Sequence, residues 1–363
     1  MRTVKKIIFV TVSMRGGGTE RVISILANHM VQNGTAVTIV MIADPTIEYF
    51  LDERIKTVCV SKATGGSLVG RIKRIWNMRR EFTSDKDTRI ISMGTVANMF
   101  TLVASIGLRN PIMISERNDP NRLNHRPIKK YEVWLRNLLY IRADKLVLQT
   151  PDVKECFPIS IQKKSVVIPN PISSELPEAN ADGKREKTVI TAGRLTEQKN
   201  HKLLINAFCK FHKMHPEYRL KIYGKGELEE ELKQYIQRCK ADQYIAVCGF
   251  CDDLYGRLQT EGMYVSSSDW EGISNSLIEA LAMGIPTIAT DCPVGGSRMF
   301  IKNEYNGLLI DTGDEEALVA AMTRIAEDEA FEKTLGNNAV QIRDDLSVEK
   351  IVGMWLQPSD DLA

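Results

Sequence analysis

The sequence has no uninterrupted apolar run of the roughly 18 residues that a membrane-spanning helix needs. Its seven cysteines are an odd number without the spacing of a disulfide framework, which favours a reducing compartment. No internal repeat or low-complexity tract is present, which excludes a solenoid. The apolar run Ile7–Val12 is short and continues into glycines without a small-residue cleavage site, so it reads as a first strand. These absences predict a cytoplasmic protein that does not cross a bilayer.

Two of the cysteines, Cys248 and Cys251, have the spacing of a metal or redox pair. A zinc site needs a second ligand pair and a redox site needs a thioredoxin-like context, and neither accompanies them. We interpret them as small buried residues at the end of a strand. Histidines and carboxylates form no cluster of metal-site type in the sequence, so neither a metal ion nor another cofactor is predicted.

The chain is long enough for two domains, because 363 residues exceed the roughly 250 at which single cores stop growing. Apolar, β-branched runs alternate with segments of helical periodicity, which predicts parallel sheets flanked by helices. The polar, proline-containing stretch 169–185 interrupts this pattern before it restarts. We therefore predict an α/β fold of two doubly wound, Rossmann-like domains, at 1–172 and 173–345. The segment 346–363 is expected to form a helix that returns to the first domain.

Charge is distributed unevenly between the two halves. Residues 1–175 contain 27 Lys and Arg against 15 Asp and Glu, whereas the remainder contains 21 against 31. Two predicted helices, Arg71–Arg80 and Lys129–Arg142, interleave basic residues with apolar and Trp positions. Such faces suit an anionic membrane surface, but an ordinary amphipathic helix with a solvated basic side fits equally well. No nucleic-acid-binding motif accompanies the charge, so no nucleic acid partner is predicted.

Ligands of open α/β sheets bind beyond the carboxyl ends of the strands, so the loops there are the candidate sites. Gly16–Gly18 follows the first strand, with Thr19 placed to cap the next helix. The loop after strand 188–192 carries Arg194 and Lys199, two cations that suit a diphosphate, although surface cations would look the same. Gly224 and Gly226 follow the next strand and fit either a nucleotide close to the backbone or a plain turn. No dinucleotide-binding G-x-G-x-x-G motif is present.

A fourth loop carries two carboxylates eight positions apart, Glu271 before a predicted helix and Glu279 one turn inside it. A carboxylate accepts two hydrogen bonds from the neighbouring hydroxyls of a sugar. The amides at the start of the helix are suited to phosphate oxygens. A helix-capping acid or an unrelated surface acid would explain either glutamate alone, but not both glutamates together with the residues around them.

These motifs carry a resemblance to a known family. Ser268 to Pro286 read Ser-Asp-x-Glu-Gly…Glu-Ala-x-Ala-x-Gly-x-Pro, and Gly193-Arg-Leu, Lys199-Asn, Pro169-Asn-Pro and Asn306-Gly-Leu-Leu occur in the family's order. The chain resembles, over nearly its whole length, the retaining glycosyltransferases of family 4. Gly16–Arg21 and Ile114–Asp119 are similar to the bacterial members that build capsule, O-antigen and lipid-linked oligosaccharides. The resemblance implies the GT-B fold, in which the two domains face each other across a cleft.

The resemblance also implies a role for each candidate residue. Arg194 and Lys199 would bind the donor diphosphate, Glu279 the ribose and Glu271 the transferred sugar, with Arg194, Lys199 and Glu271 as the catalytic residues. Many members have a histidine in the first-domain loop where this chain has Glu116 and Arg117, and either residue is a candidate to replace its contact with the donor. The other implied donor-binding residues are Gly16, Gly17, Gly18, Gly193, Gly224, Gly226, Gly272, Ile273, Ser274 and Asn275.

The implied reaction moves a hexose or N-acetylhexosamine from a nucleotide sugar, with uridine preferred over guanosine, to a polyprenyl-diphosphate-linked saccharide at the inner membrane face. No nucleophile is evident, so we expect front-side displacement, with cations and helix amides in place of a divalent ion. Two other functions fit the fold. A sugar-nucleotide epimerase would convert the nucleotide sugar without an acceptor, and a non-catalytic binding protein would bind it without turnover.

Overall fold

The computed structural model describes residues 4–61, 68–82, 86–123, 126–180, 185–251 and 254–357. The chain divides into two compact units. Unit 1 contains residues 1–171 and 347–363, and unit 2 contains residues 172–346. Both units are parallel sheets covered by helices, as the alternating pattern of the sequence predicts.

Unit 1 is built on a seven-stranded parallel sheet in the order β3-β2-β1-β4-β5-β8-β9. Its central strands are buried on both faces, which explains why they read as continuous apolar runs. The strands are β1 (Lys6–Thr11), β2 (Ala36–Met41), β3 (Lys56–Cys59), β4 (Thr88–Met93), β5 (Ile112–Ser115), β8 (Lys145–Leu148) and β9 (Ser165–Val167). A separate antiparallel pair consists of β6 (Arg122–Leu123) and β7 (Arg126–Pro127).

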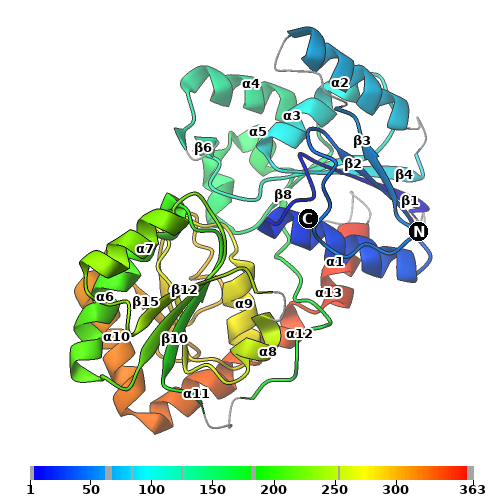
Figure 1. Cartoon of the computed structure of the whole chain (residues 1–363). Coiled ribbons are helices and arrows are strands. Elements are labelled where there is room, and N and C mark those ends of the chain that lie inside the picture. The colour runs from blue at the N-terminus through cyan, green and yellow to red at the C-terminus, as the bar shows by residue number, and fades with distance from the viewer. Residues whose placement is uncertain are drawn as a thin grey trace. The chain divides into compact units, whose positions relative to one another are not determined.

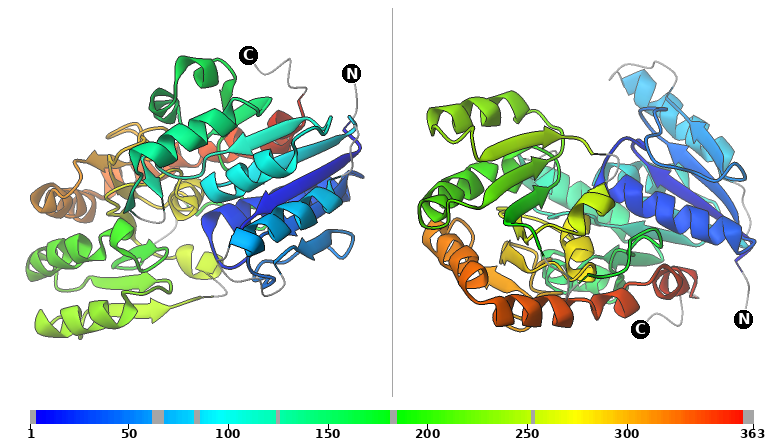
Figure 2. Two further views of the ribbon diagram at one scale, coloured as in Figure 1. Left: turned by 90° about the horizontal axis from the view of Figure 1, so that it is seen from above. Right: turned by 60° about the horizontal axis from the view of Figure 1, so that its bottom comes forward.

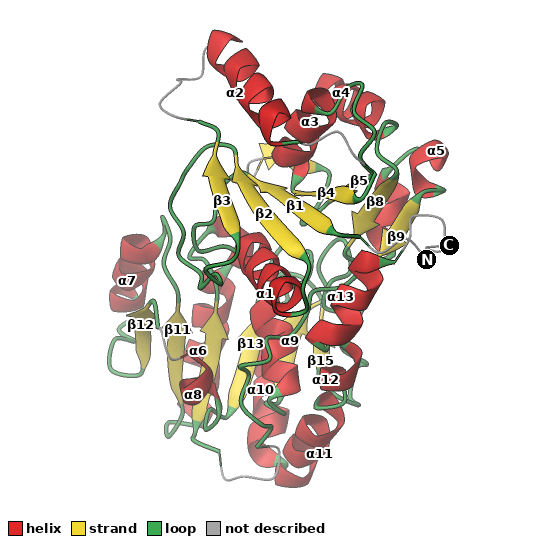
Figure 3. Cartoon of the chain, turned by 90° about the vertical axis from the view of Figure 1, so that its right-hand side faces the viewer, coloured by secondary structure: helices red, strands yellow, loops and turns green. Residues whose placement is uncertain are grey.

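Helices cover both faces of this sheet. Figure 3 shows α2, α3 and α4 on one face and α1 with α13 on the other. The returning helix α13 packs against α1, and the Trp355 carbonyl accepts a hydrogen bond of 2.5 Å from Nη1 of the buried Arg89. The helices are α1 (Gly18–Gln32), α2 (Leu68–Glu81), α3 (Thr95–Ala104), α4 (Lys130–Tyr140), η1 (Asp152–Cys156), α5 (Ile159–Gln162) and α13 (Val348–Leu356).

Unit 2 has a six-stranded parallel sheet in the order β12-β11-β10-β13-β14-β15. The strands are β10 (Thr188–Ala192), β11 (Arg219–Tyr223), β12 (Ile245–Gly249), β13 (Met263–Ser266), β14 (Thr287–Thr290) and β15 (Leu308–Ile310). The helices are η2 (Glu197–Lys199), α6 (His201–Met214), α7 (Glu229–Arg238), α8 (Leu254–Leu258), α9 (Asn275–Ala282), α10 (Glu315–Glu327), α11 (Glu329–Ala339) and α12 (Ile342–Asp345). Its core joins the α6 aromatics Phe208 and Phe211 to the strands.

The helices of unit 2 also lie on both faces of their sheet. Figure 1 shows α6 and α10 on one face, where they pack together, and α9 on the other. Figure 2 shows α10 to α12, in orange to red, following one another along this unit. Within the described ranges, no helix is both long and apolar enough to span a membrane.

The structure differs from the sequence-based predictions at several points. The strands β3, β9 and β15 are only three or four residues long and were not anticipated. Helix α1 has Gly17, not Thr19, as its N-cap. Cys248 at the end of β12 is exposed, because alternate residues of this edge strand face solvent. The interpretation of the cysteine pair as buried was therefore wrong for Cys248, and Cys251 is only partly buried.

Candidate active site

The two most informative loops of unit 2 leave the sheet at the same point. β10 and β13 are neighbours in the sheet, although β11 and β12 lie between them in the sequence. The strand order reverses there, and parallel sheets bind ligands beyond the carboxyl ends of such strands. The loop after β10 carries Arg194 and Lys199, and the loop after β13 carries Glu271. The fold thus brings together candidates that are about seventy residues apart in the chain.

Lys199 and Glu271 form an ion pair at this point. The Lys199 Nζ lies 2.5 Å from Oε2 of Glu271, and the same oxygen accepts a hydrogen bond of 3.2 Å from Ser268 Oγ. Only 14% of the Lys199 side chain and 16% of the Glu271 side chain are exposed. Burial would lower the pKa of Lys199, but the Glu271 carboxylate outweighs it and the pKa is raised. The site therefore holds a permanent cation beside a carboxylate, in a largely dry setting.

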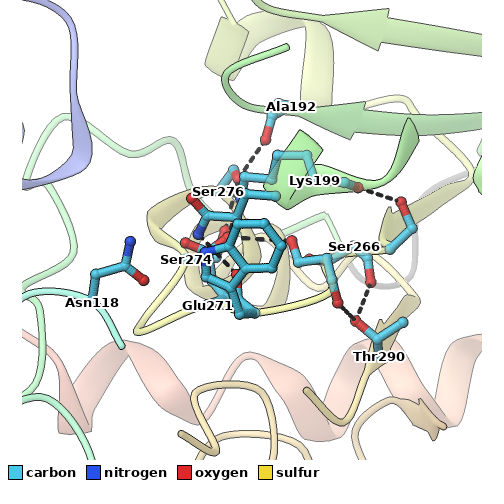
Figure 4. Close-up of polar contacts among 12 residues, drawn as sticks. Asn118, Ala192, Lys199, Ser266, Glu271, Ser274, Ser276 and Thr290 are labelled. Carbon is cyan, nitrogen blue, oxygen red and sulfur yellow. Dashed lines mark hydrogen bonds and ion pairs between the residues drawn. The ribbon is translucent and has the colours of Figure 1, made fainter. Parts of the chain in front are cut away.

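The loop that carries Lys199 is fastened to the loop that carries Glu271. Asn200 adopts the left-handed conformation with φ of 42°, and its Nδ2 donates to Asp269 Oδ1 at 2.8 Å. Ser267 Oγ donates to the Lys199 carbonyl at 2.9 Å. Figure 4 shows Lys199 and Glu271 among the polar contacts of the site. Fixed loops of this kind hold charged groups in position before a ligand arrives.

Helix α9, which follows the loop that carries Glu271, contains the second glutamate of the motif, Glu279. Glu279 is 2% exposed, and its Oε1 accepts a hydrogen bond of 3.1 Å from the Tyr255 hydroxyl of α8. Ser276 in the first turn of α9 donates to the Ala192 carbonyl at 2.7 Å, which ties the helix to the end of β10 (Figure 4). The N-cap residue Ser274 makes no capping hydrogen bond to the backbone of the helix; its Oγ lies 3.2 Å from Ser276 Oγ. The first-turn amides of α9 are thus suited to an anion.

Glycines in unit 2 allow backbone segments to touch. A Cβ on Gly224 would lie 1.8 Å from the Gly193 carbonyl oxygen, and one on Gly226 would lie 2.3 Å from that of Leu195. These contacts account for the absence of side chains at both positions without a ligand. Contact of Gly193, Gly224 and Gly226 with a donor remains a prediction.

Several residues near the site were not singled out from the sequence. Gly296, in the loop after β14, has its Cα so close to Gly272 that a Cβ would lie 1.6 Å from the Gly272 oxygen. His201 directly follows the Lys199 loop and is 3% exposed. Burial and the nearby Lys199 lower the pKa of His201 to about 4, so its ring is neutral. The pair of adjacent glycines after β14 could have pointed to Gly296 in the sequence. Nothing in the local sequence marked His201 or Ser276.

In unit 1, the glycine loop after β1 is held by acidic and aromatic neighbours. The Gly16 amide donates to Glu48 Oε2 at 2.7 Å, and the Tyr49 hydroxyl donates to the Gly17 carbonyl at 3.0 Å. Because the Gly16 amide already donates to a carboxylate, the backbone of this loop can bind an anionic oxygen. Gly18 then begins α1.

Glu116 and Arg117 are the two candidates for the donor contact of the family's histidine, and their surroundings differ. The Glu116 carboxylate is 3% exposed and accepts hydrogen bonds from the Tyr140 hydroxyl and, at 2.8 Å, from Thr95 Oγ1. Burial raises the pKa of Glu116, although the Tyr140 hydrogen bond opposes the shift. Both carboxylate oxygens of Glu116 are thus engaged within unit 1.

Arg117 has unused donors. Its Nη2 donates to Asn170 Oδ1, which also accepts a hydrogen bond of 3.0 Å from Gln149. Its Nε and Nη1 are buried and have no hydrogen-bond partner among the residues that the structure describes. Burial lowers the pKa of Arg117 to about 10, so the group stays charged at neutral pH. A buried guanidinium with unpaired donors is suited to an anionic or hydroxyl-bearing ligand.

Known proteins resemble this chain in both sequence and fold. Residues 173–341 match the family model of the glycosyl transferases group 1. The Campylobacter jejuni GalNAc-α-(1→4)-GalNAc-α-(1→3)-diNAcBac-PP-undecaprenol α-1,4-N-acetyl-D-galactosaminyltransferase is 26% identical over 97% of both chains. Another enzyme of that organism, N-acetylgalactosamine-N,N'-diacetylbacillosaminyl-diphospho-undecaprenol 4-α-N-acetylgalactosaminyltransferase, is 30% identical over 57% of each chain. The structure of Anabaena HepE in complex with UDP-glucose matches with a TM-score of 0.81, at 18% identity, over 96% of this chain and 97% of that one.

Residues 173–341 therefore match the glycosyl transferases group 1, and the chain has the GT-B fold. The resemblance drawn from Glu271, Glu279 and their surrounding motif is confirmed.

Proposed function

We propose that this protein transfers a hexose or N-acetylhexosamine from a UDP-sugar to a hydroxyl of a lipid-diphosphate-linked saccharide, with retention of configuration. The Lys199–Glu271 pair at the strand-order reversal of unit 2 carries the proposal. The names of the Campylobacter relatives support the acceptor class, and the UDP-glucose complex of HepE supports the nucleotide.

The chemistry follows from the charges of the site. The bond from the anomeric carbon to the donor phosphate breaks while a bond to the acceptor oxygen forms on the same face. The acceptor proton passes to the departing phosphate oxygen, so no protein base is needed. Lys199, Arg194 and the first-turn amides of α9 stabilise the charge that grows on the diphosphate. Glu271 holds the sugar hydroxyls and Glu279 those of the ribose.

The acceptor implies a place of action. A lipid-linked saccharide stays at the membrane, so the enzyme must reach it there. We propose that the protein works as a peripheral protein on the inner face of the membrane. The excess of Lys and Arg in residues 1–175 supports attraction to anionic lipid.

A donor screen tests the proposal. Purified protein would be offered a panel of UDP- and GDP-sugars with a short lipid-diphosphate saccharide, and products would be followed by mass spectrometry. Transfer of one sugar from a UDP donor is expected. Isomerisation of the nucleotide sugar without acceptor would indicate an epimerase, and binding without turnover would indicate a sugar-nucleotide-binding protein.

Transfer is expected to be independent of divalent metal. Lys199 and the helix amides already supply the positive charge that a metal ion provides at other nucleotide-sugar sites. The initial rate should change by less than about twofold when EDTA is added, a difference of under about 0.5 kcal/mol in the barrier. Loss of activity that Mg²⁺ or Mn²⁺ restores would contradict this.

Arg117→Gln is expected to raise the donor KM by about tenfold with a smaller effect on kcat. The substitution keeps a donor for Asn170 but removes the charge whose Nε and Nη1 have no partner among the described residues. Titration with UDP and steady-state kinetics would measure the change. A fully functional Arg117→Gln variant would rule out Arg117 as a donor ligand.

A further inference from the structure

His201 is a buried polar side chain next to the Lys199 loop. It begins α6 directly after Asn200 and is 3% exposed. Neither Nδ1 nor Nε2 of its ring has a hydrogen-bond partner among the residues that the structure describes. A buried imidazole without partners loses the hydrogen bonds that water would make to it, so such groups are rare in protein interiors. The fold of unit 2 alone thus leaves His201 without the partner that a buried ring requires.

The neighbours of His201 belong to the loop that carries the two candidate cations. Both Lys199 and the backbone of Arg194 lie close enough to His201 to act on its pKa. Burial lowers this pKa to about 4, Lys199 lowers it as well, and the Arg194 backbone opposes the shift. The ring is therefore neutral at physiological pH and carries one N–H, which either nitrogen can hold. Lys199 already pairs with Glu271, whereas the His201 ring has a donor to offer.

The turn that carries His201 is fixed by its own hydrogen bonds. Asn200 adopts the left-handed conformation, and its side-chain oxygen accepts a hydrogen bond of 3.3 Å from the Leu203 amide. The Ser267 hydroxyl donates to the carbonyls of Lys199 and Asn200 at 2.9 and 3.2 Å. A side chain on such a turn keeps its position before a ligand arrives, so the neutral ring is suited to act as a preorganised donor.

The chemistry around His201 selects a phosphate oxygen as its partner. Among the parts of a sugar nucleotide, the diphosphate is the one that requires N–H donors, since the hydroxyls of the sugar and the ribose are matched by carboxylates. Positive charge at Lys199 and Arg194 attracts an anion to this loop. Lys199 pairs with Glu271, the proposed ligand of the transferred sugar, so the phosphate next to Lys199 is the one that carries the sugar.

We propose that the neutral His201 ring donates its N–H to an oxygen of the β phosphate of the donor. This contact rests on the proposed function, because it assumes that Glu271 binds the transferred sugar and Lys199 the diphosphate. During transfer, the bond between the anomeric carbon and the β-phosphate oxygen breaks, and negative charge grows on the departing phosphate. The His201 N–H stabilises this charge without giving up its proton, so His201 is a third donor beside Arg194 and Lys199.

Affinities for UDP and UMP test the contact. His201→Phe keeps a ring of similar size but removes the N–H. We expect this variant to bind UDP at least about tenfold more weakly and UMP within about twofold of the unmodified protein, because UMP lacks the β phosphate. Calorimetric titration, with competition for the weaker ligand, would measure both affinities. Unchanged UDP affinity would overturn the proposal, and so would an equal loss for UDP and UMP.

Thermal unfolding distinguishes a ligand contact from a structural role. Replacing a buried polar group that has no partner with an apolar ring is not expected to lower Tm. The matched control is His212→Phe on the same helix. The His212 ring lies 3.1 Å from the Tyr218 carbonyl through Nδ1 and stacks on Tyr244 with ring centres 3.7 Å apart. His212→Phe should therefore lower Tm and leave UDP affinity unchanged. A large fall in Tm for His201→Phe, with equal weakening of UDP and UMP, would show a structural role for His201 and overturn the proposal.

NMR of the histidine rings tests the contact in the unmodified protein, and it decides the matter should His201→Phe fail to fold. The chain has only five histidines, so the nitrogen resonances of His201 can be assigned with a single variant, His201→Gln. Saturating UDP should shift these resonances, and saturating UMP should not. UDP binding that leaves the His201 resonances unchanged would overturn this inference alone. Absence of UDP binding to the unmodified protein would contradict the proposed function, and the inference would fall with it.

Discussion

Lys199→Ala is expected to lower kcat by about a thousandfold. The Lys199 ammonium is largely buried, pairs with Glu271 at 2.5 Å, and has a raised pKa, so its charge is present throughout the physiological range. Removal of one preorganised donor from a site that stabilises developing negative charge costs about two to three orders of magnitude in rate. Single-turnover kinetics with the donor identified by the screen would measure the chemical step directly.

The chain offers a matched control three residues away. Lys202 is exposed on α6, where its Nζ lies 2.5 Å from Oε1 of Glu231. Lys202→Ala should leave kcat within about twofold, because an exposed ion pair contributes little. Thermal unfolding of both variants would show whether loss of the buried partner also lowers stability. Equal activity of Lys199→Ala and Lys202→Ala would remove Lys199 from the mechanism.

Glu279→Gln is expected to weaken UDP binding by about ten- to a hundredfold. The Glu279 carboxylate is 2% exposed on α9, and the amide would accept fewer and weaker hydrogen bonds from ribose hydroxyls. Hydrogen bonds to charged groups are worth about 1.5–3 kcal/mol, which gives this range. Calorimetric titration with UDP would measure the loss, and the effect should appear in donor KM more than in kcat.

A second buried glutamate of unit 2 serves as control. Glu261 is 1% exposed and pairs with Lys221 at 2.9 Å. It precedes β13 and so lies at the amino ends of the strands, whereas Glu279 follows the carboxyl end of β13. Glu261→Gln should reduce stability while leaving UDP affinity unchanged. If both variants bound UDP like the unmodified protein, Glu279 would not be the ribose ligand.

Much of the architecture was predictable because its signals are local. Buried parallel strands such as β1 and β10 read as continuous β-branched runs, and the Glu271–Glu279 frame lies within one strand–loop–helix unit. Helix α4 was predicted too, but its sequence periodicity could not say which face is buried. That depends on Arg136 and Tyr140 finding partners at Pro120 and Glu116.

The remaining features depend on contacts between distant segments. Ser276 ties α9 to the end of β10 because its hydroxyl donates to the Ala192 carbonyl. Gly224 must lack a side chain because the Gly193 carbonyl lies against it. The different surroundings of Glu116 and Arg117 likewise depend on partners on other elements, such as Thr95 for Glu116. A single sequence gives no register for such contacts, so only the folded chain distinguishes a ligand-binding group from a structural one.

The anomeric configuration of the product tests the central claim most directly. Coupling constants from NMR of the product made with an α-linked UDP-sugar would show which configuration the transferred sugar has. We predict an α-linked glycoside, formed on the unmodified protein and absent with Lys199→Ala. A β-linked product would contradict front-side transfer with retention, and isomerised nucleotide sugar without a glycoside would contradict the assignment as a transferase.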